Sequence, residues 1–193
     1  WNFSYDEDSQ GAHAFELCYA AVLRALAHDL GGEWYLHALG NSELGLWWLE
    51  GLDRILADPS VWEGERGGRL RESLAVLTDD SLQPWGQVQQ LEMSHMVLGG
   101  LPKLLGFDKG PFPLPGSRGT PRQSVNVPIG DGQVSTVAPA FRMICDLGED
   151  AIWTTLPGGI DGSRFSRSYT RWLHEYLAGS YHRVAPPSHE ERV

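Results

Sequence analysis

The first part of the chain alternates apolar and polar residues with the period of an amphipathic helix. Ser9 can cap a first turn by accepting a backbone N–H, and Gly31-Gly32 end the run. The pattern therefore predicts a helix over residues 9–30. Its apolar face is predicted from positions three, four, seven and eight apart: Ala14, Leu17, Cys18, Ala21, Val22 and Ala25.

A second helix is predicted over residues 42–57, ending at the break that Asp58-Pro59 introduces. Trp47 and Trp48 lie in its middle. The favoured interpretation of this pair is core packing or an interface with another chain. A platform for a sugar or another ligand is the alternative.

Two shorter helices are expected next. Residues 66–78 place Leu70, Leu74 and Leu77 on one face of a predicted helix. A short helix is expected to begin after Pro84, in the stretch "WGQVQQLEMSH". The chain is therefore expected to be mainly helical over residues 1–105.

The second half has a different pattern. Residues 106–140 are rich in proline and glycine, which excludes a helix and predicts a long ordered connection with a strand near 123–128. "FRMICDL" and "AIWTTLP" then favour two strands of a β-hairpin. In the first of them, Phe141, Met143 and Cys145 alternate with Arg142, Ile144 and Asp146. A last helix is predicted over residues 166–178, with Gly179 at its end.

Charge and composition exclude some functional classes. The net charge of −10, from 25 acidic and 15 basic residues, argues against nucleic acid as a partner. No apolar run reaches the length of about 20 residues that spans a bilayer, so no membrane partner is expected. Cys18 and Cys145 have no metal-binding spacing; two buried free thiols are favoured over a disulfide. Because the chain begins at Trp1 without a methionine, we expect it to be a processed or trimmed product.

The sequence contains none of the common catalytic motifs, such as GxSxG, a P-loop, HExxH or SxxK. His95 is expected to be structural, with a buried ring bonded to backbone or to a carboxylate, whereas His174 and His182 are expected at the surface. The acidic stretch "YDEDS" is interpreted as part of a helix cap rather than a calcium site. No self-contained active site is expected in this chain.

Several landmarks nevertheless occur in a familiar order. "WNFSYDEDSQGAHAFE" opens the chain, "WGQVQQLEMSH" follows, and "FRMICDL" precedes a Gly-Gly loop and a Gly-x-Tyr ending. In this order the chain resembles the C-terminal part of the β chain in the penicillin acylase family of N-terminal nucleophile hydrolases. The chain departs from the family pattern where Ile160 and Asp161 replace the usual Gln and Ser, Trp172 replaces Gln, and Tyr176 replaces Trp.

The loop motif shared with the family consists of Gly158, Gly159, Asp161, Gly162, Ser166 and Tyr169. At least one of Gly158 and Gly159 is expected at positive φ, in a tight turn between a strand and the last helix. Asp161 is expected to form an Asx-turn. Tyr169, Trp172 and Tyr176 are expected to anchor the last helix, so the motif is interpreted mainly as architecture; lining of the acyl pocket is the alternative.

The resemblance implies an α+β fold: a helical first half, then strands that contribute to an αββα sandwich. Residues 1–193 would form a single segment, with the hairpin, the loop and the final helix over 141–184. It also implies an amide hydrolase that removes an acyl group from a penicillin, a cephalosporin, an acyl-homoserine lactone or a related amide. The nucleophile would lie on another segment, so no catalytic residue is assigned here. An aromatic-rich binding module without enzymatic activity is the alternative.

The resemblance also implies the partners. These are the α chain and the N-terminal part of the β chain of the same precursor, together with a small-molecule amide substrate. No cofactor or metal is assigned to this segment, and calcium is an option only for the rest of the enzyme. The expected location is the bacterial periplasm or the extracellular medium.

Overall fold

The computed structural model describes residues 4–39, 50–77, 82–95, 97–102, 105–124, 134–135, 138–149 and 151–184. Two compact units make up the chain. The first unit contains Trp1–Leu91 and Pro113–Val137, and the second contains Glu92–Phe112 and Ala138–Val193. Trp47, Trp48, most of the strand expected near 123–128 and the chain end after 184 lie outside the described residues.

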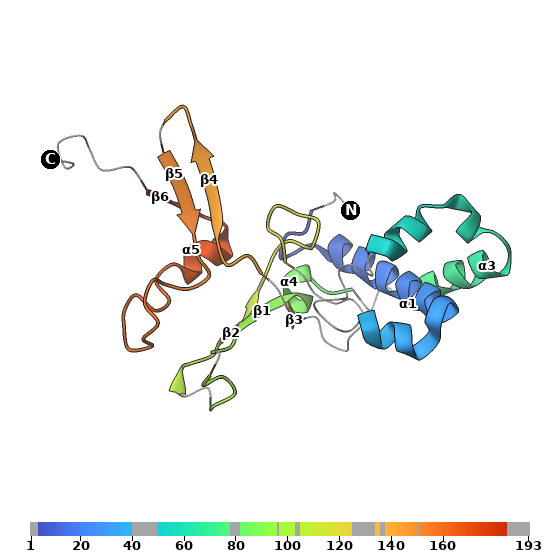
Figure 1. Ribbon diagram of the computed structural model, residues 1–193, viewed down its shortest axis with the longest axis horizontal. Helices are drawn as coiled ribbons and strands as arrows, with labels where there is room; N and C mark the ends of the chain where they lie inside the picture. Colours follow the sequence, from blue (N-terminus) through green and yellow to red (C-terminus); the bar gives the residue numbers. More distant parts are fainter. Residues whose placement is uncertain are drawn as a thin grey trace. The chain divides into compact units, whose positions relative to one another are not determined.

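The protein is a mixed α and β structure whose first half is helical, as the sequence predicts (Figure 1). None of the described helices is both long and apolar enough to cross a membrane. The elements in chain order are α1 (Gln10–Leu39), η1 (Pro59–Trp62), α3 (Gly64–Ser73), η2 (Leu74–Val76), α4 (Trp85–Val88), β1 (Gln90–Met93), β2 (Lys109–Pro113), β3 (Val134–Ser135), β4 (Arg142–Asp146), β5 (Ala151–Thr155), α5 (Leu173–Ala178) and β6 (His182–Val184).

The first helix begins and breaks where the sequence predicts. The Oγ atom of Ser9 accepts a hydrogen bond from the Ala12 N–H at 3.1 Å, which satisfies a backbone donor of the first turn. Gly32 has φ 59° and ψ −146°, so the regular helix breaks at this glycine before the chain turns helical again.

The buried face of α1 differs from the predicted apolar face. Of the predicted positions only Val22 is buried; the other five are half-buried. The buried stripe instead carries two polar side chains, His13 and Glu16, among apolar neighbours. A count of apolar positions therefore misplaces the face. The buried positions of α1 are Ala12, His13, Glu16, Ala20, Val22, Leu23, Leu26 and Ala27.

A hydrophobic core joins the helices of the first unit. Its buried members are Val22, Leu23, Leu26, Ala27, Leu52, Val61 and Leu70. Residues 50–56 are helical and end before Asp58, which caps η1 by accepting the Ser60 N–H at 2.9 Å. Leu70 is buried as predicted, but Leu74 and Leu77 are 37% and 42% exposed because α3 ends at Ser73 and the chain tightens into η2.

Trp85 and Gln89 hold three stretches of the first unit together. The indole Nε1 of Trp85 and the amide Nε2 of Gln89 both donate to the carbonyl oxygen of Gly116, at 2.9 and 2.7 Å. The Gly116 N–H in turn donates to the Tyr5 carbonyl at 2.9 Å, and the Tyr5 ring meets the Trp85 ring edge to face. The Trp85 and Gln89 side chains are fully buried. The predicted short helix is confirmed as α4, although its sequence continues as strand β1.

The proline-rich connection contains a strand that the sequence pattern did not predict. β2 includes Pro111 and Pro113 and lies at the end of a sheet with the order β2-β1-β3. Proline is tolerated in an edge strand because its missing N–H removes no bond from the interior of the sheet. β1 and β3 pair in parallel, with Gln90 opposite Val134 and Leu91 opposite Ser135.

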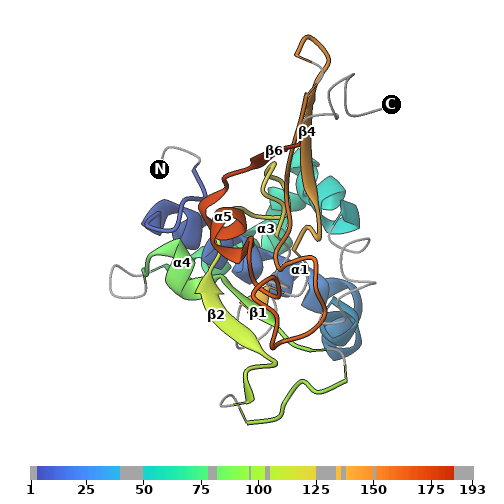
Figure 2. The same ribbon diagram turned by 90° about the vertical axis from the view of Figure 1, so that its left-hand side faces the viewer.

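The second unit is organised around an antiparallel sheet with the order β4-β5-β6. The predicted hairpin is confirmed: Arg142 pairs with Thr155 and Asp146 with Ala151. Gly179 ends α5 in the left-handed conformation at φ 71°, as expected, but the helix begins at Leu173 rather than near 166. The third strand, β6, was not predicted. Figures 1 and 2 show the hairpin extending away from α5.

The burial of β4 differs from the simple alternation read from its sequence. Arg142 is buried, and its guanidinium lies 4.0 Å from the Tyr176 ring centre while Nη1 donates to the Tyr176 carbonyl at 3.1 Å. Met143 and Ile144, on opposite faces, are 52% and 51% exposed. Cys18 and Cys145 are both free thiols, as expected. The expectation that both are buried is wrong, because Cys18 is half-buried and Cys145 is exposed.

We expect Gln89→Leu to lower the free energy of unfolding by about 1–3 kcal/mol, because it removes a buried donor from the Gly116 carbonyl and the Ser124 hydroxyl. Gln87→Leu is the matched control, because Gln87 lies two positions before Gln89 but is exposed; it should change stability by less than about 0.5 kcal/mol. Urea unfolding of the purified protein measures both. Equal losses in the two variants would contradict a linking role for Gln89.

Candidate functional site

The Gly-Gly loop lines a pocket in the second unit. This pocket has a volume of about 200 Å³. Gly158, Gly159, Asp161 and Tyr169 of the predicted motif contribute to its wall, whereas Gly162 and Ser166 do not. Residues from a preceding part of the chain complete it: Met93, Ser94, His95, Phe107 and Lys109. The structure thus brings four motif residues together around one cavity.

Glycine is required in this loop for a different structural reason from the one expected. Neither Gly158 nor Gly159 has a φ in the left-handed region, so the expectation of a positive φ is wrong. A Cβ on Gly159 would lie 1.4 Å from the Ser168 carbonyl oxygen, which leaves no space for a side chain. A Cβ on Gly158 would lie 3.7 Å from its nearest neighbouring atom, which is an ordinary contact. The Gly158 carbonyl accepts the Trp172 N–H at 3.1 Å. Close approach of two backbone segments therefore requires glycine at position 159.

The predicted Asx-turn at Asp161 is present. Its Oδ1 atom accepts the Ser163 N–H at 2.9 Å, and this hydrogen bond holds the pKa of the exposed Asp161 carboxyl below its usual range. The chain then continues as turns, in which the Ser166 Oγ accepts the Ser168 N–H at 3.1 Å. The loop is therefore ordered by its own side chains up to the start of α5.

The three aromatic residues contact the second unit in separate ways rather than from one helix. Tyr169 lies before α5, and its hydroxyl donates to the Phe107 carbonyl at 3.2 Å. Trp172 stacks on the His182 ring with 4.3 Å between ring centres. Tyr176 is fully buried, and its hydroxyl donates to the Pro139 carbonyl at 2.9 Å.

His95 accepts hydrogen bonds from backbone. Its Nδ1 atom accepts the Val97 and Leu98 N–H groups at 3.2 and 3.1 Å, which places the ring proton of a neutral imidazole on Nε2. The predicted bonding to backbone is confirmed, but the residue is half-buried rather than buried. His174 is exposed as expected, whereas His182 is half-buried with Nδ1 3.3 Å from Glu175 Oε2.

A buried carboxyl group of the first unit, that of Glu16, was missed by the sequence analysis. Its side chain is buried, and its Oε1 atom accepts the Tyr5 hydroxyl at 2.7 Å. Burial raises the pKa of the Glu16 carboxyl, and the Arg118 guanidinium, 3.9 Å from Oε2, opposes that rise. Glu16 lies beside a pocket of about 370 Å³ that Tyr5, Ser117 and Arg118 also line. The sequence signal that could have identified it is a lone acidic residue among the apolar positions of α1.

Tyr19 and Asp53 extend this polar group. The Tyr19 hydroxyl donates to Asp53 Oδ1 at 2.5 Å, and the Arg118 guanidinium lies 4.1 Å from the Tyr19 ring centre. Burial is the first cause that raises the pKa of the Tyr19 hydroxyl. Within the described part of the chain, no three His, Cys, Asp or Glu side chains lie close enough together to hold a metal ion.

Gly159→Ala should lower the free energy of unfolding by about 1–3 kcal/mol, because the added methyl group overlaps the Ser168 carbonyl and the loop has to shift. Gly158→Ala adds the same group at ordinary contact distance and should cost less than about 1 kcal/mol. Denaturant unfolding of the two variants compares neighbouring positions directly. A larger loss at Gly158 than at Gly159 would show that the close approach is not the constraint.

Glu16→Gln should stabilise the protein more at neutral pH than at acid pH. Since burial raises the folded-state pKa, the folded chain binds the proton more tightly, and the free energy of unfolding falls as the pH rises from about 4.5 through that raised pKa. Glutamine stays neutral and keeps an oxygen for Tyr5. The variant-minus-wild-type difference, measured by urea unfolding, should therefore grow between about pH 4 and about pH 7. Glu63→Gln, at an exposed position, is the control, and a flat or falling difference for Glu16→Gln would contradict the desolvated carboxyl.

The comparison with known proteins agrees with the order of landmarks in the sequence. The sequence model of the penicillin amidase family matches residues 1–189. No individual curated protein matches the chain significantly. Because the family match extends over almost the whole sequence, this chain belongs to the penicillin amidase family.

Proposed function

We propose that this chain is the C-terminal part of the catalytic β chain of an N-terminal nucleophile hydrolase that removes an acyl group from an amide. Membership of the penicillin amidase family implies an amide hydrolase, and the match over residues 1–189 is the observation that carries the proposal. The proposed substrates are penicillins, cephalosporins, acyl-homoserine lactones or related linear amides.

In the proposed mechanism, a Ser, Thr or Cys at the N-terminus of another segment attacks the amide carbonyl carbon. Its hydroxyl or thiol proton passes to its own α-amino group, whose pKa near 8 suits a base at neutral pH. Collapse of the tetrahedral intermediate expels the amine, which takes up that proton, and water then hydrolyses the acyl-enzyme. Backbone donors that stabilise the intermediate are each worth about 3–4 kcal/mol. No residue of this chain is assigned to these steps.

The proposed contribution of this chain is architectural. The β4-β5-β6 sheet would join the αββα sandwich, and its surface supports that role. Met143 and Ile144 face opposite sides of the sheet and are both about half exposed, and Ile152 is 40% exposed. Apolar residues exposed on both faces suit a sheet that other layers cover.

The partners in this proposal are the α chain and the N-terminal part of the β chain, and the proposed location is the bacterial periplasm or the extracellular medium. No cofactor is proposed for this segment, and calcium is left to the rest of the enzyme. His95 is proposed as a structural residue, since its Nδ1 atom accepts two backbone N–H groups. A terminal amine acting as base makes an imidazole base unnecessary.

The proposal is tested by expressing the complete gene and sequencing the N-terminus of every polypeptide in the purified protein. We expect this chain to co-purify with a segment that begins with Ser, Thr or Cys. Alanine at that first residue should abolish amide hydrolysis, while His95→Gln should keep turnover per processed molecule. His174→Gln, at an exposed position, is the control for His95.

Two results would contradict the proposal. One is a stable 21.4 kDa monomer that binds glycans and hydrolyses no amide, which would favour a binding module instead. The other is a loss of turnover of about a thousandfold in His95→Gln with processing intact, which would place an imidazole in the proton transfer.

A further inference from the structure

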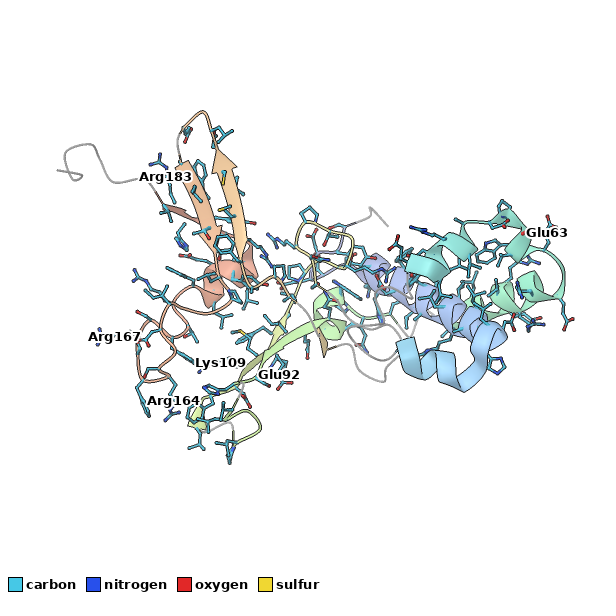
Figure 3. The ribbon with its side chains drawn as sticks, in the orientation of Figure 1. Glu63, Glu92, Lys109, Arg164, Arg167 and Arg183 are labelled. Carbon is cyan, nitrogen blue, oxygen red and sulfur yellow. The ribbon has the colours of Figure 1, made fainter. Side chains whose placement is uncertain are left out.

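Two cationic side chains of the second unit point toward the same small volume. Lys109 comes from β2 and Arg164 from the loop before α5, and Figure 3 shows both on the same part of this unit. The Arg164 Nη1 and Lys109 Nζ atoms lie 3.1 and 3.9 Å from the position that a Cβ on Gly106 would occupy. Glycine at this position leaves the space between the two charges open.

Neither cation has an acidic partner among the described residues. The ion pairs of that part of the chain do not include Lys109 or Arg164. The Nε atom of Arg164 is buried and has no hydrogen-bond partner there. Two like charges brought together repel each other, and a half-buried donor without a partner is costly. An anion between the two side chains would relieve their mutual repulsion.

Aromatic rings flank the two charges. The Arg164 guanidinium lies 5.0 Å from the ring centre of Phe107 and 4.3 Å from that of Phe165. Lys109 Nζ lies 6.0 Å from the Tyr169 ring centre. Phe107, Lys109 and Tyr169 also line the pocket of about 200 Å³ beside the Gly-Gly loop. Lys109 therefore lines a cavity with aromatic walls, and Arg164 lies against Phe107 in that wall.

We propose that Lys109 and Arg164 form the anion-binding end of this pocket, which takes a small monocarboxylate with a flat apolar body. A carboxylate has two oxygens, so it can accept one charge-assisted hydrogen bond from each cation at about 2.7–2.9 Å. The apolar body then lies against Phe107, Tyr169 and Met93.

The acidic residues of the unit favour a single negative charge on the ligand. Asp161 lines the same pocket, and Asp108, the neighbour of Lys109 in the chain, accepts the His95 N–H at 2.9 Å. A dianion such as phosphate would be repelled more strongly by these carboxylates than a monocarboxylate. The inference stands on the contacts of the second unit and does not rest on the proposed amide hydrolysis.

The test measures binding of benzoate to the complete, processed protein by ligand-observed NMR. Benzamide, which has the same shape without the charge, and inorganic phosphate are the comparison ligands. Lys109→Met and Arg164→Met each remove one cation and keep an apolar stem. Arg167→Met is the matched control, because Arg167 lies in the same loop, is exposed and has no acidic partner among the described residues (Figure 3).

We expect benzoate to bind the wild type and the Arg167 variant equally. Its dissociation constant should rise about tenfold to a hundredfold in each of the Lys109 and Arg164 variants. Benzamide should bind at least about tenfold more weakly than benzoate. The two cations are removed in separate variants. If one variant folds poorly, the benzoate affinity of the other still tests the proposal.

Four results would overturn the assignment. Unchanged benzoate affinity in both variants would place any benzoate site elsewhere in the protein. Equal binding of benzamide would exclude an anion site. If inorganic phosphate competes with benzoate and binds more tightly than benzoate does, the site is a phosphate site. Failure of benzoate to bind the wild type, with a lower melting temperature in both variants, would mean that an acidic side chain of another segment occupies the pair.

Discussion

The carbonyl oxygen of Gly116 is the acceptor on which the first unit depends. It receives a hydrogen bond from the Trp85 indole and another from the Gln89 amide, and both donors are fully buried. Through these bonds, and through the Gly116 N–H to the Tyr5 carbonyl, three stretches distant in sequence share one point. Since each group has lost its contact with water, removing one donor leaves its partner unsatisfied in the interior. Polar bonding as well as apolar packing therefore determines how the unit is arranged.

Glycine at position 86 belongs to the same arrangement. A Cβ there would lie 3.0 Å from the side chains of Glu7 and Pro113. The Gly86 N–H donates to the Glu7 carbonyl at 2.8 Å. The "WG" pair thus combines a large buried donor with a neighbour that has to be small. This is a physical reason for that pair in the landmark "WGQVQQLEMSH".

Local signals in the sequence were sufficient for several element ends, although the end of α3 and the start of α5 were misplaced. The Ser9 cap, the break at Gly32, the hairpin after Phe141 and the stop at Gly179 each depend on neighbouring residues, and each was predicted. Features that depend on distant contacts were not. The buried Glu16 depends on Tyr5 and on Arg118, which lies about a hundred residues later in the chain. The Gly159 constraint arises from Ser168, nine residues later, and has no signature in the glycine itself.

The candidate site shows the same division. The sequence identified Gly158, Gly159, Asp161 and Tyr169 as a motif, and the structure places all four around one pocket. It gave no sign that Lys109 would lie beside them, because the strand expected in that proline-rich stretch was placed near 123–128 and not at 109–113. A pocket wall assembled from two separate segments can be recognised only once their pairing is known.

The exposed hairpin has a consequence for how such a protein has to be made. β4 is at the end of its sheet and presents backbone groups together with apolar side chains and the free thiol of Cys145. Such an edge also suits pairing with another copy of itself, which begins aggregation. On the proposed assembly, synthesis as one precursor keeps the covering strands tethered nearby, at an effective concentration of about millimolar, so that they reach the edge before another molecule does. Cutting the chain would then be harmless only after folding, and mixing the separated chains would be a poor route to the enzyme.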